Sequence, residues 1–144
     1  MKNTVISDGE GRVRYLGDTV AGSTHDYSLL KEELSPDVDW FKDIEVWLDL
    51  GYQGIKKDYS SPEDIHIPHK KPRKSKSNPK PKLSRQQKKE NREIGKVRVT
   101  VEHAIGGIKR FNILTTKFRN KIKNFANDVI FIASGLWNIK FYYY

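Results

Sequence analysis

Two carboxylates stand out because the residues around them are not those of ordinary solvated acids. Asp49 directly follows the apolar run 44–48 and precedes a Gly-Tyr turn. Burial of an unpaired carboxylate is costly, so a buried strand that ends in one indicates a role for the charge. Glu102 lies one helical turn before Gly106 in VRVTVEHAIGGIKRF. A glycine at that spacing leaves room for a metal ion, a backbone segment or a phosphate to approach. The other reading stays open: the glycines admit a packed helix, and Glu102 pairs with Arg98.

The charge distribution indicates what such carboxylates would act on. The chain carries a net charge of +9, and its bases crowd residues 70–98, where only Glu90 and Glu93 oppose them. This excess predicts a polyanionic partner, nucleic acid first and a membrane surface second. An acidic half joined to a basic half favours a site that holds both metal and phosphate. A folded domain followed by a solvated basic segment is the alternative.

Composition limits the classes of protein and site. The 144 residues suit one domain, and 36% hydrophobic content allows a modest core. The absence of cysteine excludes disulfides and thiolate zinc sites. The four histidines have no paired spacing that would favour a metal site. No apolar run is long enough to span a bilayer and no signal peptide is recognisable, so we expect a cytoplasmic protein without membrane contact.

Local patterns predict an α/β protein with a mixed sheet. We expect a hairpin whose strands, 3–7 and 12–16, are joined by the turn Asp8-Gly9-Glu10-Gly11. Nearly all side chains of the run 44–49 are apolar, on both faces, which favours an interior, parallel strand. A short strand over 65–68 follows.

The remaining segments predict helices and one irregular insertion. Ser23 and Asp26 have capping-box spacing ahead of a helix that Pro36 ends. Residues 70–84 are rich in proline, serine and lysine and predict a flexible insertion. The expected helices are a short one over 52–59, a long one from about Ser84 and a very apolar one over 125–141, with Phe131 and Trp137 in the core or at its edge.

Three motifs, in this order, resemble the DDE transposases. They are GSTHD (22–26), LDLGYQG (48–54) and RVTVEHAIGGIKRF (98–111). The resemblance runs from about residue 2 to residue 138 and is strongest to bacterial insertion-sequence transposases related to the eukaryotic Harbinger elements. It implies an RNase H-like fold and metal-dependent DNA cleavage and strand transfer, with transposon ends and target DNA as partners.

The resemblance also assigns roles to residues. Three acids of the family bind two divalent ions, normally Mg²⁺, with Mn²⁺ as the alternative. Asp49 matches the second acid and Glu102 the third. Asp26, with His25, would be accessory to the site, although helix capping is the simpler role for Asp26. Together with the basic run, the motifs predict these DNA contacts: Lys70, Lys71, Arg73, Lys74, Arg98, Lys109 and Arg110.

One departure from the family shapes the functional prediction. The first catalytic Asp belongs on a strand upstream of residues 3–7, in the middle of the sheet beside strand 44–49. We therefore expect residues 1–140 to be part of a catalytic domain with an incomplete RNase H-like fold and long C-terminal helices. Strand 44–49 would keep an open edge. Such a chain would be inactive as an isolated fragment and would partner the upstream part of the transposase. The alternatives are a non-catalytic, basic DNA-binding remnant and, more distantly, a ribosomal-type RNA-binding protein.

Overall fold

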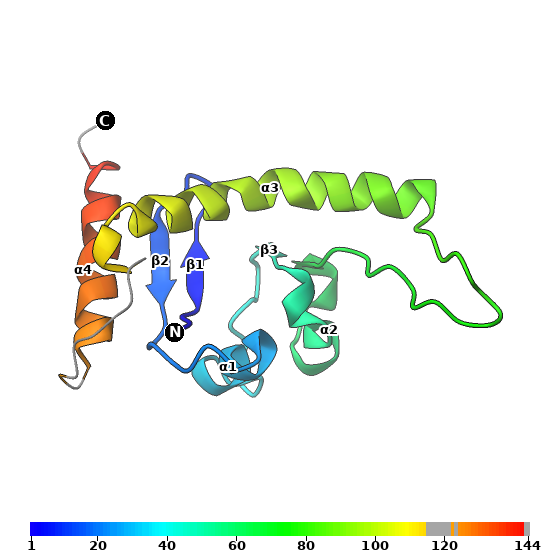
Figure 1. Cartoon of the computed structure of the whole chain (residues 1–144), viewed down its shortest axis with the longest axis horizontal. Helices are drawn as coiled ribbons and strands as arrows, with labels where there is room; N and C mark the ends of the chain where they lie inside the picture. The colour runs from blue at the N-terminus through cyan, green and yellow to red at the C-terminus, as the bar shows by residue number, and fades with distance from the viewer. Residues whose placement is uncertain (115–121, 123, 143–144) are drawn as a thin grey trace. The chain divides into compact units, whose positions relative to one another are not determined.

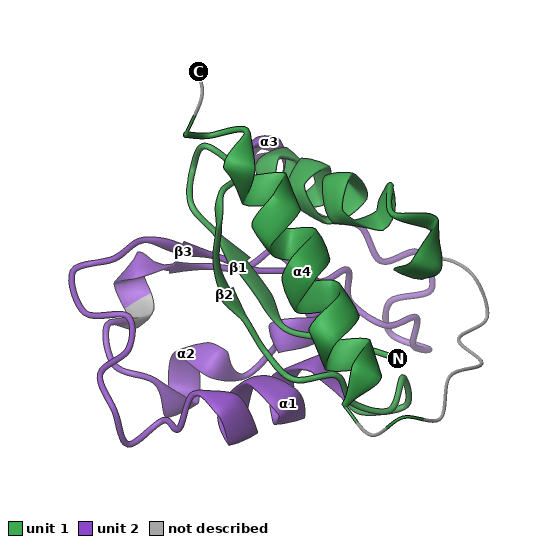
Figure 2. Cartoon of the chain, turned by 90° about the vertical axis from the view of Figure 1, so that its left-hand side faces the viewer, with its two compact units in different colours: residues 1–24, 99–144 green, residues 25–98 purple. Residues whose placement is uncertain are grey.

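The computed structural model describes residues 1–114, 122 and 124–142 (Figure 1). The chain divides into two compact units, described here one at a time: unit 1 holds residues 1–24 and 99–144, and unit 2 holds residues 25–98 (Figure 2). Helices and strands alternate along the chain, which confirms the predicted α/β class. They are β1 (Val5–Ser7), β2 (Val13–Leu16), α1 (Asp26–Glu33), β3 (Val46–Trp47), α2 (Ile55–Asp58), β4 (Ile65–His66), α3 (Arg85–Lys109) and α4 (Phe125–Ile139).

Unit 1 is built on the predicted hairpin of β1 and β2. The two strands pair antiparallel, with Val5 opposite Leu16, and an irregularity follows Ile6. The turn is held by Asp8, whose Oδ1 accepts the backbone N–H groups of Glu10 (3.1 Å) and Arg12 (2.9 Å). The hairpin prediction is therefore confirmed, with the Asp8 carboxylate as the group that closes the turn.

Helix α4 satisfies backbone groups at the outer edge of β2. The side-chain amide of Asn138 accepts the Val13 N–H and donates to the Val13 carbonyl, both at 2.9 Å. Three helical turns earlier, Asn127 Oδ1 accepts the Thr19 N–H at 2.7 Å. These amides replace the backbone partners that a further strand would supply, so the hairpin needs no strand on that side.

The two adjacent glycines of α3 have different surroundings. A Cβ built on Gly107 would lie 1.9 Å from a ring carbon of Trp137, whereas one on Gly106 would have nothing within 4 Å. The Trp137 ring is further fixed by its Nε1–H, which donates to the Gly11 carbonyl at 2.9 Å. Close helix packing therefore explains Gly107, and open space remains at Gly106.

Unit 2 holds a second, smaller sheet. Strands β3 and β4 pair in parallel, with Val46 opposite Ile65, as expected. The prediction of an interior strand buried on both faces is wrong: Ile44 is 54% exposed, and Val46 and Trp47 are half-buried. The reason is that, among the described residues, β3 has a strand partner on one edge only. The core instead forms from helix and loop side chains, including Leu29, Leu30, Phe41, Ile55 and Tyr59.

Helix α1 begins differently from the expectation. Its N-cap is His25, whose Nδ1 accepts the Tyr27 N–H at 3.3 Å. Asp26 is the first residue inside the helix, so the predicted capping role of Asp26 and the Ser23–Asp26 capping box are wrong. The Asp26 carboxylate lies against Gly51 instead.

Helix α3 confirms the predicted long helix and begins with a capping box. Ser84 N–H donates to Gln87 Oε1, and Gln87 N–H donates to Ser84 Oγ, both at 3.0 Å. Residues 70–84 before it form neither helix nor strand. No helix in the described part of the chain is both long and apolar enough to cross a membrane.

Candidate functional site

Asp49 occupies the turn at the end of β3. It is the N-cap of a single-turn 3₁₀ helix, Leu50–Tyr52, and its Oδ1 accepts the Leu50 N–H at 2.6 Å. Its Oδ2 lies 3.3 Å from Arg98 Nη2, and the side chain is 58% exposed. The expectation that Asp49 ends a buried strand is therefore wrong. Its carboxylate is oriented by two donors and remains open to solvent, which suits binding of a cation or a polar ligand.

Arg98 forms an ion pair with Asp49. It lies on α3 within unit 2, and only 23% of its side chain is exposed. The sequence predicts Arg98 as a DNA contact, and the structure places its guanidinium against the carboxylate instead of leaving it wholly in solvent. Such a pair holds the carboxylate in one orientation and offsets its charge.

The turn after Asp49 also receives the carboxylate of Asp26. A Cβ on Gly51 would lie 2.8 Å from Asp26 Oδ2, so this approach needs a residue without a side chain. Burial raises the pKa of Tyr52 to about 12, with further contributions from the negative charges of Asp26, Asp49 and Glu33. The Tyr52 phenol therefore stays protonated at neutral pH. Asp26, the last residue of the GSTHD motif, thus meets the LDLGYQG motif inside unit 2.

Glu102 belongs to unit 1 and lies on α3, four residues after Arg98 in the sequence. Its side chain is exposed, as are Gly106, Lys109 and Arg110 in the following turns. The open space at Gly106 is on the same helical face as Glu102 because the two are one turn apart. The third motif therefore presents an accessible carboxylate with bases close by in the sequence.

The oxygen atoms of the two carboxylates suit a hard cation, but two carboxylates alone do not complete a metal site. Asp49 and Glu102 offer oxygen ligands of the kind that Mg²⁺ prefers. In the described part of the chain, no three His, Asp or Glu side chains lie together in a way that could hold a metal ion. A metal at either carboxylate would need further ligands from water, phosphate or another acid.

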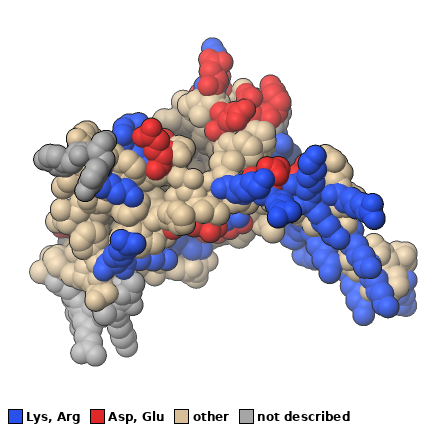
Figure 3. Space-filling model, turned by 90° about the horizontal axis from the view of Figure 1, so that it is seen from above, with Lys and Arg blue, Asp and Glu red and all other residues tan. Residues whose placement is uncertain are grey.

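The predicted basic region is exposed. Residues 70–80 are all exposed, and Lys and Arg atoms cover the region of the irregular segment and the first half of α3, with few acids among them (Figure 3). His69, at the start of the segment, makes a short contact through Nε2 with the Glu90 carboxylate. The side chains predicted to bind DNA from this segment, Lys70, Lys71, Arg73 and Lys74, are therefore accessible.

One pair of contact residues was missed in the sequence. Asn127 and Asn138, which bind Thr19 and Val13, are polar residues three turns apart on a mostly apolar helix, a signal that could have identified them. Lys80 and Lys82, which belong to the predicted basic run, line a hollow in the basic segment. The alternation Pro79-Lys80-Pro81-Lys82 distinguishes them from the other lysines.

Comparison with known proteins agrees with the family that the three motifs resemble. Residues 1–138 match the family model described as DDE superfamily endonuclease. A protein of Microchaete diplosiphon described as "Probable transposase for insertion sequence element IS702" is 36% identical over 117 residues, which cover 81% of this chain and 38% of that protein. The chain thus spans well under half of that relative's length. None of the solved protein structures shows a significant match. The match over nearly the whole chain establishes that it belongs to the DDE superfamily endonucleases.

Proposed function

We propose that this chain is part of the catalytic domain of a DDE transposase that cuts and joins DNA in transposition. The observation that supports this most is the placement of Asp49. Its motif lies within the family match, and its carboxylate is at the exposed end of β3, oriented by Leu50 N–H and Arg98. The proposed domain spans residues 1–140, with 70–84 as a basic insertion, and works in the cytoplasm.

In this proposal Asp49 and Glu102 are metal ligands, with Mg²⁺ as the normal ion and Mn²⁺ as its substitute. Two ions bound in such a site stabilise the attacking and leaving oxygens of a phosphodiester exchange. Leu50 N–H and Arg98 fix the direction of the Asp49 carboxylate before any ligand arrives. Lys109 and Arg110 follow Glu102 closely enough to contact phosphate near the reacting bond.

Asp26, with its neighbour His25, has an accessory role in the proposal. The Asp26 carboxylate lies against Gly51, two residues from Asp49, and His25 starts the helix that presents it. Gly51→Ala should push this carboxylate away, because the added Cβ would lie 2.8 Å from Asp26 Oδ2. We expect the metal affinity attributed to Asp49 to fall several-fold. Unchanged affinity would remove Asp26 from the site.

The proposal includes a partner that carries the first of the three catalytic acids. Among the described residues, β3 pairs only with β4, so its other edge can accept a strand. The relative from Microchaete diplosiphon extends well beyond the aligned region. We propose that this strand comes from the upstream part of the transposase, and that the isolated chain does not cleave DNA.

A second candidate function is a basic DNA-binding protein that cuts nothing. The exposed bases of residues 70–98 favour it, and so does the absence of a three-residue metal group among the described residues. In this case Asp49 would serve only as the cap of its 3₁₀ helix and as the partner of Arg98.

Manganese titration separates the two functions. Mn²⁺ binding to the whole chain is followed by electron paramagnetic resonance, and Asp49→Asn and Glu102→Gln are compared with Glu63→Gln, an exposed acid outside the motifs. The transposase proposal expects weak binding that both motif variants reduce about tenfold and that the control leaves unchanged. Equal binding by all four proteins would favour the second function.

Cleavage requires a further step, because the chain alone is expected to be inactive. Supercoiled plasmid is incubated with Mg²⁺ and the chain, with and without the upstream part of a related transposase. Nicking that needs both polypeptides and is lost in Asp49→Asn would support the proposal. Plasmid left intact by the mixture would contradict it.

A further inference from the structure

The basic segment 70–84, called here the Lys-Pro loop, is fixed where it begins. The backbone N–H of His69 donates to Asn91 Oδ1 at 2.7 Å, and Asn91 Nδ2 donates back to the His69 carbonyl at 3.1 Å. The contact between the His69 ring and Glu90 adds a third link to α3. A segment that is only solvated charge has no need of such an anchor.

The other end and the tip of the loop are also held. The capping box of Ser84 and Gln87 fixes the exit into α3. At the tip, Ser75 and Asn78 exchange backbone hydrogen bonds of 3.1 and 3.2 Å, so the chain folds back on itself. Two arms result, 70–74 and 79–83, that run between fixed points.

Prolines restrict both arms. Pro72 lies in the first arm, and Pro79 and Pro81 lie in the second. A proline has a fixed φ and also restricts the residue before it to extended conformations. The arms therefore have few alternative conformations, although they contain no regular strand.

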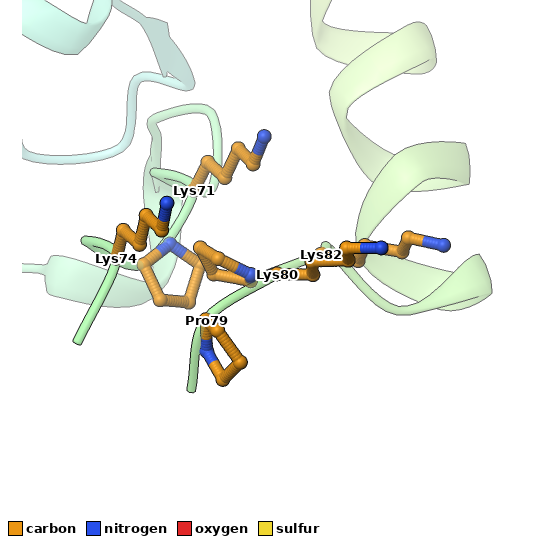
Figure 4. A pocket seen from close by; sticks show the side chains of 7 residues that line it. Lys71, Lys74, Pro79, Lys80 and Lys82 are labelled. Carbon is orange, nitrogen blue, oxygen red and sulfur yellow. The ribbon is translucent and has the colours of Figure 1, made fainter. Parts of the chain in front are cut away.

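The arms flank an open hollow of about 500 Å³, which lysines line from both sides mainly through their aliphatic stems. Lys71 and Lys74 come from the first arm, and Lys80 and Lys82 from the second (Figure 4). The other lining residues are the three prolines, and no carboxylate is among them. None of the four lysines forms an ion pair with a described acid. Like charges carried by two neighbouring arms repel each other, so the arrangement favours binding of a polyanion.

We infer that the Lys-Pro loop is a pre-arranged clamp for the phosphate backbone of DNA, with Lys71, Lys74, Lys80 and Lys82 as the contacts. This inference rests on the proposed function, which supplies DNA as the substrate. Lysine ammonium groups contact phosphates without reading base edges, so binding at the loop should be independent of sequence. The prolines lower the ordering cost of binding because the free loop already resembles the bound one.

The test measures affinity of the whole chain for a short random-sequence DNA duplex by fluorescence anisotropy at several salt concentrations. In the loop variant, Lys71, Lys74, Lys80 and Lys82 are changed to Gln. The matched control removes the same charge from the exposed face of α3 by changing Arg85, Lys88, Lys89 and Arg92 to Gln. Circular dichroism checks that each variant retains its helices.

We expect the loop variant to reduce the slope of log affinity against log salt by about 3 to 4, since each phosphate contact contributes about 0.9. The α3 control should reduce this slope by about 1 or less. Equal reductions in the two variants would overturn the clamp and leave general DNA binding intact.

A third variant tests pre-arrangement without changing charge. With Pro72, Pro79 and Pro81 changed to Ala, affinity should fall about ten- to a hundredfold, at roughly two- to fivefold per proline, while the salt slope stays the same. Wild-type affinity in this variant would overturn the clamp and leave the proposed function standing. Failure of the unaltered chain to bind duplex DNA at low salt would overturn both.

Discussion

The two units achieve cohesion in different ways. In unit 2 the described buried apolar side chains are mostly large: Leu29, Leu30, Leu34, Phe41, Ile55, Tyr59, Ile65 and Ile94. In unit 1 they are Ala104, Ile108 and Ala133, and α4 leaves Phe131 48% and Ile132 64% exposed. Phe131, predicted in the core or at its edge, is thus not part of the fully buried core.

In unit 1, directed hydrogen bonds and one close helix contact provide the stability that a large apolar core provides in unit 2. Asn127, Trp137 and Asn138 hydrogen-bond the hairpin backbone, and the Trp137 ring packs on Gly107. A unit stabilised by burial is most sensitive to the loss of side-chain volume. A unit stabilised by a few directed contacts is most sensitive to added volume or to loss of a single partner. Hydrogen exchange measured by mass spectrometry can locate each effect, because it reports stability segment by segment.

The largest effect is expected from truncation in the core of unit 2. Ile65 is fully buried, so Ile65→Ala removes contacts and leaves a cavity, which costs about 2–5 kcal/mol. Hydrogen exchange should accelerate throughout residues 25–98. Ile132→Ala on the exposed face of α4 is the control and should change stability little. Similar acceleration in both variants would contradict the comparison.

The second effect comes from added volume in unit 1. Gly107→Ala places a Cβ 1.9 Å from the Trp137 ring and should destabilise unit 1 by about 1–3 kcal/mol. Gly106→Ala is the matched control: with nothing within 4 Å, it should stabilise α3 by up to about 1 kcal/mol. Hydrogen exchange in residues 1–24 and 125–142 should report the stability change in each of the two variants. The same sign of change for the two variants would show that α4 does not pack on α3 as described.

A smaller effect follows from loss of a side-chain amide. Asn138→Ala leaves the Val13 N–H and carbonyl without their partner and should cost about 1–3 kcal/mol at most. Asn138→Asp keeps the acceptor but removes the donor, so its cost should be intermediate if both hydrogen bonds matter. The amide protons of β2 are the probes. Protection of Val13 that persists in Asn138→Ala would refute the role of this contact.

The smallest effect is the pH dependence of the hairpin. Burial opposes ionisation of Asp8, but hydrogen bonds from Arg12, Arg14 and Glu10 hold its pKa below the ordinary value of 3.8. A lowered pKa means that ionised Asp8 stabilises the fold above its unfolded pKa, and that this contribution is lost as pH falls through the folded value. The protection factors of the hairpin amides, which correct for intrinsic exchange at each pH, should therefore fall below about pH 4 in the native chain. Asp8→Asn should flatten that dependence, and an unchanged profile would assign it to other acids.

Features set by neighbours in the sequence could be predicted. The Asp8 turn, the strand before Asp49 and the long helix from Ser84 follow from local patterns of turn, apolar and capping residues. The family motifs likewise assign Asp49 and Glu102 without reference to coordinates, because each motif is contiguous in the chain. Those assignments remain predictions that the metal titration tests.

Tertiary structure alone decided what those patterns left open. Gly106 and Gly107 are indistinguishable in the sequence, and only the position of Trp137 separates an open surface from a packed contact. Asp26 looked like a helix cap, but the backbone placed His25 there and left Asp26 against Gly51. The exposure of Asp49 and its pairing with Arg98 depend on segments far apart in the chain. Local sequence patterns indicate secondary-structure propensity and polarity, whereas these contacts depend on which distant segments of the chain pack together.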